Sequence, residues 1–436
     1  MTPRITHADL GPDFYDVVAP AQFPQHILRY RNQRAAAQVG LDGLTDAAWI
    51  DHFARFVPLP GSFERPLALR YHGHQFQHYN PDLGDGRGFL FAQALDSSGR
   101  LLDFGTKGSG TTPWSRGGDG RLTLKGGMRE LLATSYLEAQ GVLTSRTFSL
   151  VETGEDLQRG DEPSPTRSAV LVRLNHSHIR IGTFQRLAAR RETANVQRLM
   201  DHCVQYYVPE GAGGPAAFLD AVVGRVAVLT AQYMAAGFVH GVLNTDNINI
   251  TGESFDYGPW RWLPTYDPAF TAAYFDHGGL YAYGRQPETM VWNLSRLAEC
   301  LLPLAEHDAL VAVLETFSSR FRVALDSATA WRLGVDRLNS AAWWAWLSAS
   351  QMPFEAAFHA CHRGAVPAGA GWDGARAALA GSAPTRAHHP YFDTGPCTML
   401  VDDVEGLWAP IADADDWKPL HAKLEAIEYM RVAYDG

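Results

Sequence analysis

Apolar residues in the front half of the chain recur in short runs that have the length and spacing of β-strands. Several such runs occupy residues 66 to 107, separated by turns that contain glycine, and two more follow at 146–152 and 168–174. Between them, residues 122–140 repeat leucines at helical intervals, and Gly141 stands where a helix commonly ends. This pattern predicts a β-rich front half that contains one long helix.

The pattern elsewhere is mostly helical. Residues 21–57 carry apolar side chains at helical intervals, and an apolar helix is expected from about 217 to 236, ending at Gly237. From about residue 285 onwards the spacing is again mostly helical, except that an alanine-, glycine- and proline-rich stretch at 363–386 is expected to be a loop. The back half is therefore predicted to be rich in α-helix.

Two polar segments divide this pattern. Residues 152–167 are expected to form a surface loop between the last two front-half strands, and residues 209–215 mark a boundary between the halves. The prediction is an α+β protein with four segments: a helical or extended N-terminal segment (1–65), a β-rich lobe (66–185), an α-rich lobe (186–300) and a helical C-terminal extension of that lobe (301–436).

Composition limits the classes of partner. The 436 residues include 37 Lys and Arg against 47 Asp and Glu, a net charge of −10. This acidic balance argues against a nucleic-acid surface or an anionic membrane as the partner, although a local basic pocket is compatible with it. The four cysteines are far apart, and no secretory signal or uninterrupted run of 18 apolar residues is present, so a cytoplasmic protein without a membrane helix is expected.

A glycine-rich segment is the first candidate for chemistry. In LGDGRGFLF, Gly84, Gly86 and Gly88 lie between two strand-like runs, and Arg87 lies among them. Glycines there allow positive φ and close backbone approach, so that amide groups could face a phosphate. The segment lacks the lysine of a Walker loop, and an ordinary glycine-rich hairpin remains the alternative.

Lys107 ends the strand that follows this segment, and Glu130 lies on the next predicted helix. Protein kinases hold ATP phosphates with a lysine on a strand that pairs with a helix glutamate, after a glycine-rich loop. A surface lysine and an unrelated glutamate are the alternative for each residue taken singly. The order of the three features favours the kinase-like interpretation.

The strongest set of candidates follows the apolar helix. Kinases place a catalytic aspartate, then a metal-binding asparagine, then a D-F-G aspartate after such a helix. Here Asn247 and Asp256 have oxygen atoms suited to Mg²⁺. His240-Gly241-Val242 stands where the kinase sequence H-R-D would be, so the usual base is missing, and Asp246 is the substitute at the right place.

Other polar residues stand within apolar runs. Arg173 lies inside VLVRL, and Arg180 follows it; each needs an anionic partner, either a carboxylate or a polyphosphate. The histidines of YHGHQFQHY and the HACH segment at 359–362 have the residue types of metal ligands without a convincing spacing, so structural roles are expected.

These motifs together make the chain recognisable. It resembles the selenoprotein O family, also called the YdiU family, whose members are protein adenylyltransferases with a pseudokinase fold. The matching strings are YHGHQF, LGDGRG, KGSGTTPWSRGGDGR, VRLNHSHIRIGTFQ, HGVLNTDN, DYGP and WNLSRLAE, and they run in family order over roughly residues 10–300. One departure is Gln77, where the family usually has glycine.

The resemblance implies a bilobed, kinase-like fold and a reaction that the spacing alone does not show. Family members bind ATP in an orientation flipped relative to ordinary kinases and transfer AMP to protein hydroxyls. Carried over by motif, Asp246 is the catalytic proton acceptor and Asn247 and Asp256 hold Mg²⁺ or Mn²⁺, with Glu130 supporting Lys107. The implied ATP-binding residues are Gly84, Gly86, Arg87, Lys107, Asp119, Gly120, Arg173, Arg180 and Asp256.

Three functions follow as alternatives. The resemblance favours a metal-dependent transfer of AMP from ATP to Ser, Thr or Tyr hydroxyls of proteins, with release of pyrophosphate. A kinase-like phosphotransferase and a catalytically inactive ATP-binding regulator are the other two. ATP and a protein substrate are the expected partners of the first.

Overall fold

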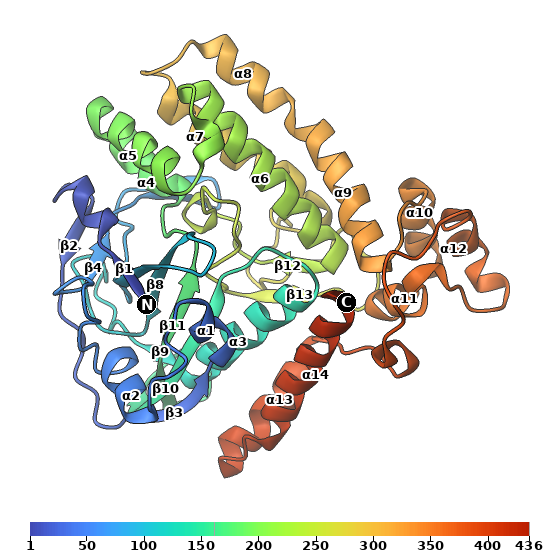
Figure 1. Ribbon diagram of the computed structural model, residues 1–436, viewed down its shortest axis with the longest axis horizontal. Coiled ribbons are helices and arrows are strands. Elements are labelled where there is room, and N and C mark those ends of the chain that lie inside the picture. The colour runs from blue at the N-terminus through green and yellow to red at the C-terminus, as the bar shows by residue number, and fades with distance from the viewer. Residues whose placement is uncertain (161, 436) are drawn as a thin grey trace.

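An antiparallel sheet of nine strands forms the front half of the chain in the computed structural model, which describes residues 1–160 and 162–435. The sheet order is β2–β4–β7–β8–β11–β10–β3, with β1 added on β7 and β9 on β11 (Figure 1). The strands are β1 (Thr2–Arg4), β2 (Tyr15–Val17), β3 (Ile27–Arg31), β4 (Leu67–Leu69), β7 (Leu90–Leu95), β8 (Leu101–Lys107), β9 (Leu122–Thr123), β10 (Arg146–Leu157) and β11 (Thr166–Asn175).

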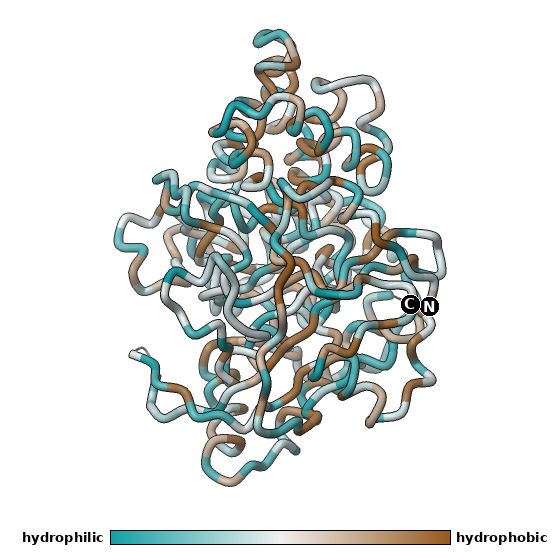
Figure 2. The backbone as a smooth tube through the Cα atoms, turned by 90° about the vertical axis from the view of Figure 1, so that its left-hand side faces the viewer, coloured by the Kyte–Doolittle hydropathy of each residue, from teal (hydrophilic) through white to brown (hydrophobic). Residues whose placement is uncertain are grey.

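Both faces of this sheet are buried, which explains why its central strands are almost continuously apolar. Leu150 and Leu171 face the helix α3 (Leu124–Ala139), whereas their neighbours face the opposite side. There α2 (Asp46–Phe53) inserts Trp49, whose indole N–H donates to the Ser149 hydroxyl at 2.9 Å. In Figure 2 the hydrophobic stretches run through the middle of the molecule and the hydrophilic stretches lie mostly at its periphery.

The N-terminal segment corrects one prediction. Residues 27–31, which fall within the stretch expected to be helical, form β3 and pair with β10. Only α1 (Gln33–Gln38) and α2 are helical in that stretch. An apolar spacing of three or four residues fits a short strand as well as a helix, and here the free edge of β10 decides the outcome.

The segment 152–167 is a second correction. Its two ends are strand, because β10 continues to Leu157 and β11 begins at Thr166, whereas residues 158–160 and 162–165 between them have no strand and residue 161 lies outside the described residues. A register shift between Glu152 and Asp156 marks a bulge, beyond which polar residues pair across the two strands. Arg167 donates to both carboxylate oxygens of Glu152 at 2.7 Å. Ladder hydrogen bonds and ion pairs therefore extend this hairpin into a polar sequence.

Helices dominate the back half, as predicted (Figure 1). Within the expected loop at 363–386, however, the short helix α12 forms and packs on α10. The main back-half helices are α4 (Ile181–Ala189), α5 (Thr193–Tyr206), α6 (Pro215–Ala236), α7 (Gln286–Leu301), α8 (His307–Glu315), α9 (Phe317–Leu333), α10 (Ser340–Ser350), α11 (Phe354–Ala360) and α12 (Asp373–Ala378).

The helix α6 is the centre of the back half. It ends at Gly237, whose left-handed φ of 66° closes the last turn, as the sequence predicts. By length and composition α6 is also the one helix of the described chain able to cross a membrane, but 67% of its most apolar window is buried inside the protein. Its apolar surface is used in the core, where it packs against α7, α8 and α9.

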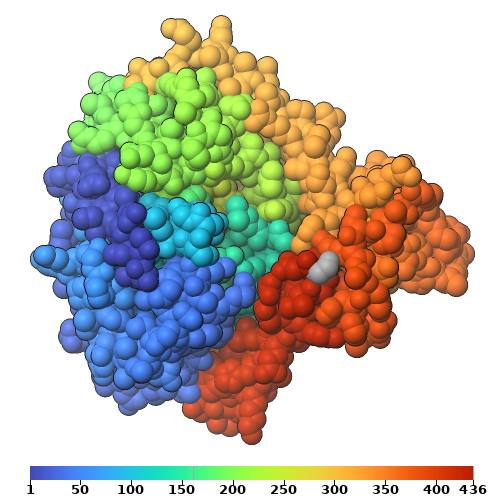
Figure 3. Space-filling model, in the orientation of Figure 1, coloured from blue at the N-terminus to red at the C-terminus, as the bar shows by residue number. Residues whose placement is uncertain are grey.

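The last two helices return to the front half. In Figure 1, α13 (Val401–Ala414) and α14 (Lys418–Asp435) lie beside α3 and below the other back-half helices, and Figure 3 shows this C-terminal region (red) against the front half (blue). Between them, Asp415 accepts hydrogen bonds from Arg29 and Arg167, which belong to two strands of the sheet. The chain end thus packs on the helix and the sheet that carry Glu130 and Arg173.

Candidate active site

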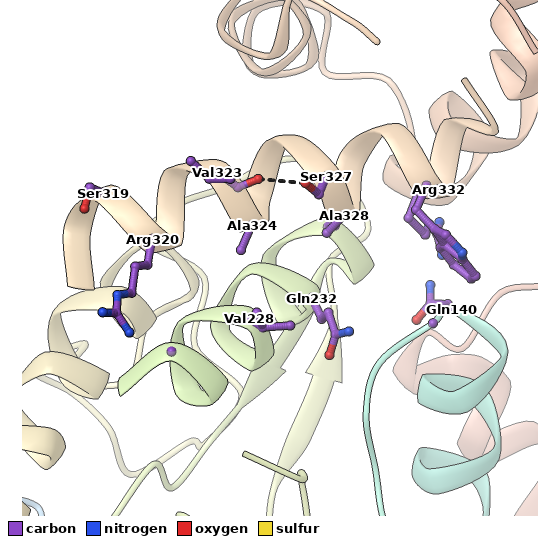
Figure 4. Close-up of a pocket in the computed structure, with 14 residues that line it drawn as sticks. Gln140, Val228, Gln232, Ser319, Arg320, Val323, Ala324, Ser327, Ala328 and Arg332 are labelled. Carbon is purple, nitrogen blue, oxygen red and sulfur yellow. Dashed lines mark hydrogen bonds between the residues drawn. The ribbon is translucent and has the colours of Figure 1, made fainter. Parts of the chain in front are cut away.

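Two cavities in the described part of the chain differ in their chemistry. A groove of about 780 Å³ between α6 and α9 is mainly apolar, and Val228 of α6 faces Ala324 and Ala328 of α9 across it (Figure 4). The second is a polar cleft of about 690 Å³. Of the residues singled out from the sequence, the cleft is lined by Gly84, Gly86, Arg87, Lys107, Asp119, Gly120, Arg173, Asp246, Asn247 and Asp256.

The glycine-rich segment forms a loop rather than a hairpin between paired strands. β6 (His78–Asn80) precedes it and pairs with β5 (Gly73–Gln75), whereas β7, which follows it, belongs to the large sheet. Neither Gly84 nor Gly86 has a positive φ, so the expectation of left-handed backbone there was wrong.

What these glycines permit is close approach of a second loop. A Cβ on Gly84 would lie 2.4 Å from the Trp114 ring, and one on Gly86 would lie 2.8 Å from the Trp114 carbonyl oxygen. The Ser115 hydroxyl donates to the Gly86 carbonyl at 2.5 Å. The two loops therefore form one wall of the cleft, and Gly120, with a φ of 70°, lies in the second loop.

Lys107 and Glu130 form a buried ion pair between β8 and α3. The Lys107 ammonium is also 3.4 Å from a carboxylate oxygen of Asp256. Arg173, on the neighbouring strand β11, donates to that same oxygen at 2.8 Å and lies 3.7 Å from Glu130. Two cations and two carboxylates thus form one network at the base of the cleft, with both cations also lining the cavity.

Arg180, unlike Lys107 and Arg173, lies outside the lining of the cleft. Its side chain is only 1% exposed and does not line the cleft; it lies over the rings of Tyr71 and Phe255, 4.0 Å and 4.8 Å from their centroids. Its guanidinium donates to Asp256 at 3.2 Å and to the backbone carbonyl of Asp246 at 3.0 Å. Arg180 therefore braces the two acidic residues from behind.

Three cations surround the carboxylate of Asp256. Burial by itself would raise the pKa of this group, but Arg173, Lys107 and Arg180 outweigh that effect and hold the pKa well below its ordinary value. The residue also has a φ of 63°, a left-handed conformation that a non-glycine residue rarely adopts. An ionised carboxylate in a strained backbone at the base of a cleft is typical of a functional group.

Asp246 and Asn247 lie on a single turn, Thr245–Asn247, that lines the same cleft as this carboxylate. Burial raises the pKa of Asp246 to about 6. In the described part of the chain, its Oδ1 atom is buried without a hydrogen-bond partner. The Asn247 amide donates its N–H to the Val242 carbonyl at 2.8 Å, which leaves its side-chain oxygen for another ligand.

These oxygen atoms suit a hard divalent cation. Mg²⁺ binds few protein oxygens and keeps waters and substrate phosphates in its shell, which matches one amide oxygen and one or two carboxylates at an open cleft. The chain has no cluster of three or more His, Cys, Asp or Glu residues able to hold a metal within 1–160 and 162–435. The donors present therefore fit a metal shared with a substrate rather than a closed structural site.

The remaining sequence candidates lie at the rim or outside the cleft. Asp119 is half exposed and forms an ion pair with Arg159 at 2.8 Å. His72 contacts the Tyr79 hydroxyl at 2.5 Å, and His74 contacts the Gln185 amide at 2.6 Å. In the HACH segment, His362 stacks on Phe392. These histidines have hydrogen-bonding or packing partners, in keeping with structural roles.

Several residues of the site were missed by sequence reasoning. Asp85, in the glycine-rich loop, lies 3.6 Å from Arg180, and burial raises its pKa. His178 contacts Arg173 directly, and Asp103 is linked to Arg173 through His178. His178 stands within the quoted string VRLNHSHIRIGTFQ, but nothing in the linear spacing connects it to Asp103, which is 75 positions away.

The chemistry of the cleft defines a class of protein. Cations that converge on a water-accessible polar cavity, beside acidic oxygens that suit a divalent cation, are the features of enzymes that transfer phosphate-linked groups. Its walls come from the sheet, from the loops on either side of β7 and β8 and from the segment after α6, so distant parts of the chain contribute to it.

Comparison with known proteins defines the family. The sequence profile described as "Protein adenylyltransferase SelO" matches residues 2–365. The "Protein nucleotidyltransferase YdiU" of Synechocystis sp. is 51% identical over 348 residues, 77% of this chain and 72% of that protein. The protein of the same name in Gloeobacter violaceus is 45% identical over 452 residues, 95% of this chain and 92% of that protein. The chain belongs to the SelO family of protein adenylyltransferases.

The comparisons also extend the sequence interpretation. The motifs that carry the resemblance span roughly residues 10–300, whereas the family profile reaches residue 365. The Gloeobacter protein matches almost the whole chain, so the helical C-terminal region has a counterpart in at least this relative. A related YdiU protein of Bradyrhizobium sp. is 40% identical over 341 residues, 76% of this chain and 68% of that protein.

Proposed function

We propose that this enzyme transfers AMP from ATP to Ser, Thr or Tyr hydroxyls of proteins and releases pyrophosphate. The observation that carries the proposal is the convergence of Lys107, Arg173 and Arg180 on Asp256 beside a second buried aspartate, Asp246. Names given to the relatives support the nucleotidyl transfer, and the polar cleft supplies charges suited to a triphosphate.

The bound nucleotide would meet three parts of the chain. Arg87, with the backbone of Gly84 and Gly86, would line one side, and Asp119 and Gly120 would line the outer rim. Lys107, held by Glu130, and Arg173 would neutralise phosphate oxygens from the base. Arg180 would act indirectly, by holding the Asp256 carboxylate and the Asp246 backbone in place.

The transfer forms a bond from the acceptor oxygen to the α-phosphorus and breaks the bond from that phosphorus to the pyrophosphate oxygen. Asp246 would orient the acceptor hydroxyl and accept its proton, a role that its orphaned Oδ1 atom leaves open. Lys107 and Arg173 would balance the charge that grows on the departing pyrophosphate. Asn247 and Asp256 would hold Mg²⁺ or Mn²⁺, which neutralises phosphate charge when bound.

The same proposal covers architecture and location. The sheet with α3 would correspond to the smaller lobe of a kinase-like bilobed fold and α4 to α7 to the larger one, with the cleft between them. On this view residues 1–65 pack on the lobes, 66–185 and 186–300 form them, and 301–436 extend the second. A cytoplasmic location, with ATP and reduced thiols available, fits four cysteines that are free in the structure.

The test is an incubation of the purified protein with Mg²⁺ or Mn²⁺ and ATP that carries its label on either the α- or the γ-phosphate. A mixture of proteins rich in exposed Ser, Thr and Tyr serves as the acceptor, and the label is read after denaturing electrophoresis. We expect the label to be retained only from the α-phosphate. Retention only from the γ-phosphate would establish a kinase instead, and retention of neither would favour an ATP-binding regulator.

A further inference from the structure

The three nitrogens of the Arg173 guanidinium have different surroundings. One terminal nitrogen, Nη1, donates to Asp256 at 2.8 Å, and Nε–H donates to the Nε2 atom of His178 at 3.2 Å. Among residues 1–160 and 162–435, no hydrogen-bond acceptor contacts the other terminal nitrogen, Nη2, and Arg173 lines the cleft. The Nη2 edge is thus the part of this guanidinium left for a ligand.

The contact with Arg173 determines which nitrogen of His178 carries the proton. A guanidinium N–H can only donate, so Nε2 of His178 must present its lone pair. The other ring nitrogen, Nδ1, lies 3.3 Å from a carboxylate oxygen of Asp103 and therefore carries the hydrogen. Burial, together with the charge of Arg173, lowers the pKa of His178, which keeps this neutral tautomer in place.

Asp103 is itself held firmly. Its carboxylate accepts hydrogen bonds from the His178 backbone N–H at 2.9 Å, from the Gln93 amide at 2.7 Å and from the Tyr207 hydroxyl at 3.3 Å. Burial raises the pKa of Asp103, but the hydrogen bonds from the His178 and Gln93 side chains outweigh burial, so the pKa is lowered. An ionised, fully bonded carboxylate gives the His178 ring a fixed support.

The backbone makes room for this arrangement. Gly105 lies opposite Arg173 in the β8–β11 ladder, and a Cβ on it would fall 1.9 Å from Nε2 of His178. The turn before His178 is held by Asn249, whose amide donates to the Ser177 carbonyl at 2.5 Å. Asn249 is two positions after Asn247, so the same loop that carries the acidic residues also fixes the turn of His178.

We propose that Asp103 and His178 form a positioning pair that fixes the Arg173 guanidinium edge-on, with Nη2 presented to the phosphates of ATP. The proposal rests on the proposed function, because ATP is the ligand that it names. His178 is a positioning residue: it is 3% exposed, does not line the cleft, and acts through Arg173. Without it, Arg173 would keep its charge but lose the constraint on its Nε edge.

The experiment measures the binding of ATP and of adenosine, each with Mg²⁺, by isothermal titration calorimetry. Adenosine lacks phosphates and reports whether the rest of the pocket is intact. We expect His178→Leu to weaken ATP binding about tenfold, the size of one charge-assisted hydrogen bond, and to leave adenosine binding unchanged. His178→Gln, whose side-chain oxygen can accept from Nε–H, should recover most of the ATP affinity.

A double-mutant cycle tests whether the effect passes through Arg173. Arg173→Lys has no Nε–H edge, so adding His178→Leu to it should change ATP affinity by less than about twofold. In Gly105→Ala the added methyl group would displace the His178 ring, so this variant should weaken ATP binding as much as His178→Leu does. His176→Leu is the matched control: the same exchange at a histidine that bonds the Leu101 carbonyl instead, expected to leave ATP affinity unchanged.

The outcomes separate this inference from the proposed function. If the unmodified protein binds no ATP, the proposed function itself fails. If it binds ATP but His178→Leu binds equally well, or if the Arg173→Lys and His178→Leu losses multiply, the positioning pair is refuted. An equal loss of ATP and adenosine binding in both His178→Leu and His178→Gln would show a purely structural role and refute it as well.

Discussion

At the scale of single residues, the environment of Asp256 is the most informative feature of the cleft. Its carboxylate has Lys107, Arg173 and Arg180 within ion-pair distance, and Glu130 and Asp85 share that positive charge. A carboxylate so strongly stabilised stays ionised at any physiological pH and can serve a divalent cation together with a triphosphate.

Asp256→Ala is expected to abolish label transfer, with a loss of at least about 100-fold, and to weaken metal-dependent ATP binding. The reason is that the substitution removes a metal ligand and leaves three buried cations without their common partner. Transfer of α-labelled AMP and ATP titration with and without Mg²⁺ measure both effects. Asp308→Ala, at a fully exposed aspartate of α8, is the matched control; near-normal turnover of Asp256→Ala would refute the site assignment.

Asp246→Asn should separate chemistry from binding. The bond from Arg180 goes to the backbone carbonyl of residue 246 and not to its carboxylate, so the substitution leaves the loop braced. We expect the transfer rate to fall about 100-fold, in the range for loss of a general base, with ATP affinity largely unchanged. Single-turnover transfer and calorimetry give the two numbers, and weaker ATP binding at an unchanged rate would contradict the base role.

Glu253 gives a prediction about pH and stability. Burial raises the pKa of this carboxyl from 4.5 to about 7, although it accepts a hydrogen bond from the His176 backbone N–H at 2.6 Å. Below pH 4.5 the Glu253 carboxyl is protonated in both the folded and the unfolded state, so it does not affect the free energy of unfolding there. As the pH rises from 4.5 towards 7, only the unfolded state loses the proton, and the free energy of unfolding falls. By linkage the loss at higher pH is about 3 kcal/mol.

Glu253→Gln keeps an oxygen acceptor for the His176 N–H and cannot ionise. The variant should therefore gain in thermal unfolding temperature over the unmodified protein as the pH is raised from 5 to 8. Other titrating groups are common to both proteins and cancel in the difference. A difference that stays constant, or that shrinks, across this pH range would show that Glu253 does not carry the raised pKa.

At the scale of elements, the two loops at the cleft wall depend on glycines for contact with each other and not for left-handed backbone. Gly84→Ala would drive a methyl group to 2.4 Å from the Trp114 ring and push the second loop away. We expect about a tenfold loss of ATP affinity with a small loss of stability, because the wall moves while the core does not. Calorimetry and thermal unfolding measure the two.

The matched control is Gly43→Ala. Gly43 has open space around the position of a Cβ and no positive φ, so the same change should leave both ATP affinity and stability nearly unaltered. Equal ATP affinity in Gly84→Ala and Gly43→Ala would mean that the loop contact at Trp114 has no part in nucleotide binding.

Elements differed in how far the sequence predicted them. The helices α3 and α6 were predicted closely, because each has a long apolar repeat and a glycine at its end. Residues 27–31 and 152–167 were misassigned because their structure comes from pairing with a distant strand, which no local pattern reports. The ion pair of Lys107 with Glu130 was expected only from the order of motifs along the chain.

At the scale of the whole molecule, Tyr434 shows how the chain end is tied to the rest. Its ring stacks on Trp331 at 5.4 Å and lies 5.2 Å from the Arg332 guanidinium, both on α9. The side chain is buried, and within the described residues its hydroxyl has no hydrogen-bond partner. The packing of this ring, and not its hydroxyl, therefore holds α14 in place.

Tyr434→Ala is expected to cost about 3–5 kcal/mol of unfolding free energy, as for other buried aromatic truncations. Tyr434→Phe keeps the ring and removes an unsatisfied hydroxyl, so it should be neutral or slightly stabilising. Denaturant unfolding measures both. Equal destabilisation of the two variants would show that the hydroxyl has a partner after all and that packing is not the main term.

The sequence by itself determined the long helices, the β-rich and α-rich character of the two halves, and a set of candidate site residues most of which line the cleft, because these depend on local apolar periodicity and on motifs with characteristic chemistry. Only the tertiary structure decided which strands pair, why Gly84 and Gly86 are glycines, that Arg180 lies behind the cleft, and that His178 and Asp103 support Arg173. Those contacts join residues far apart in the chain, and their energies arise from burial and pairing that exist only once the sheet, α3 and the loop after α6 have come together.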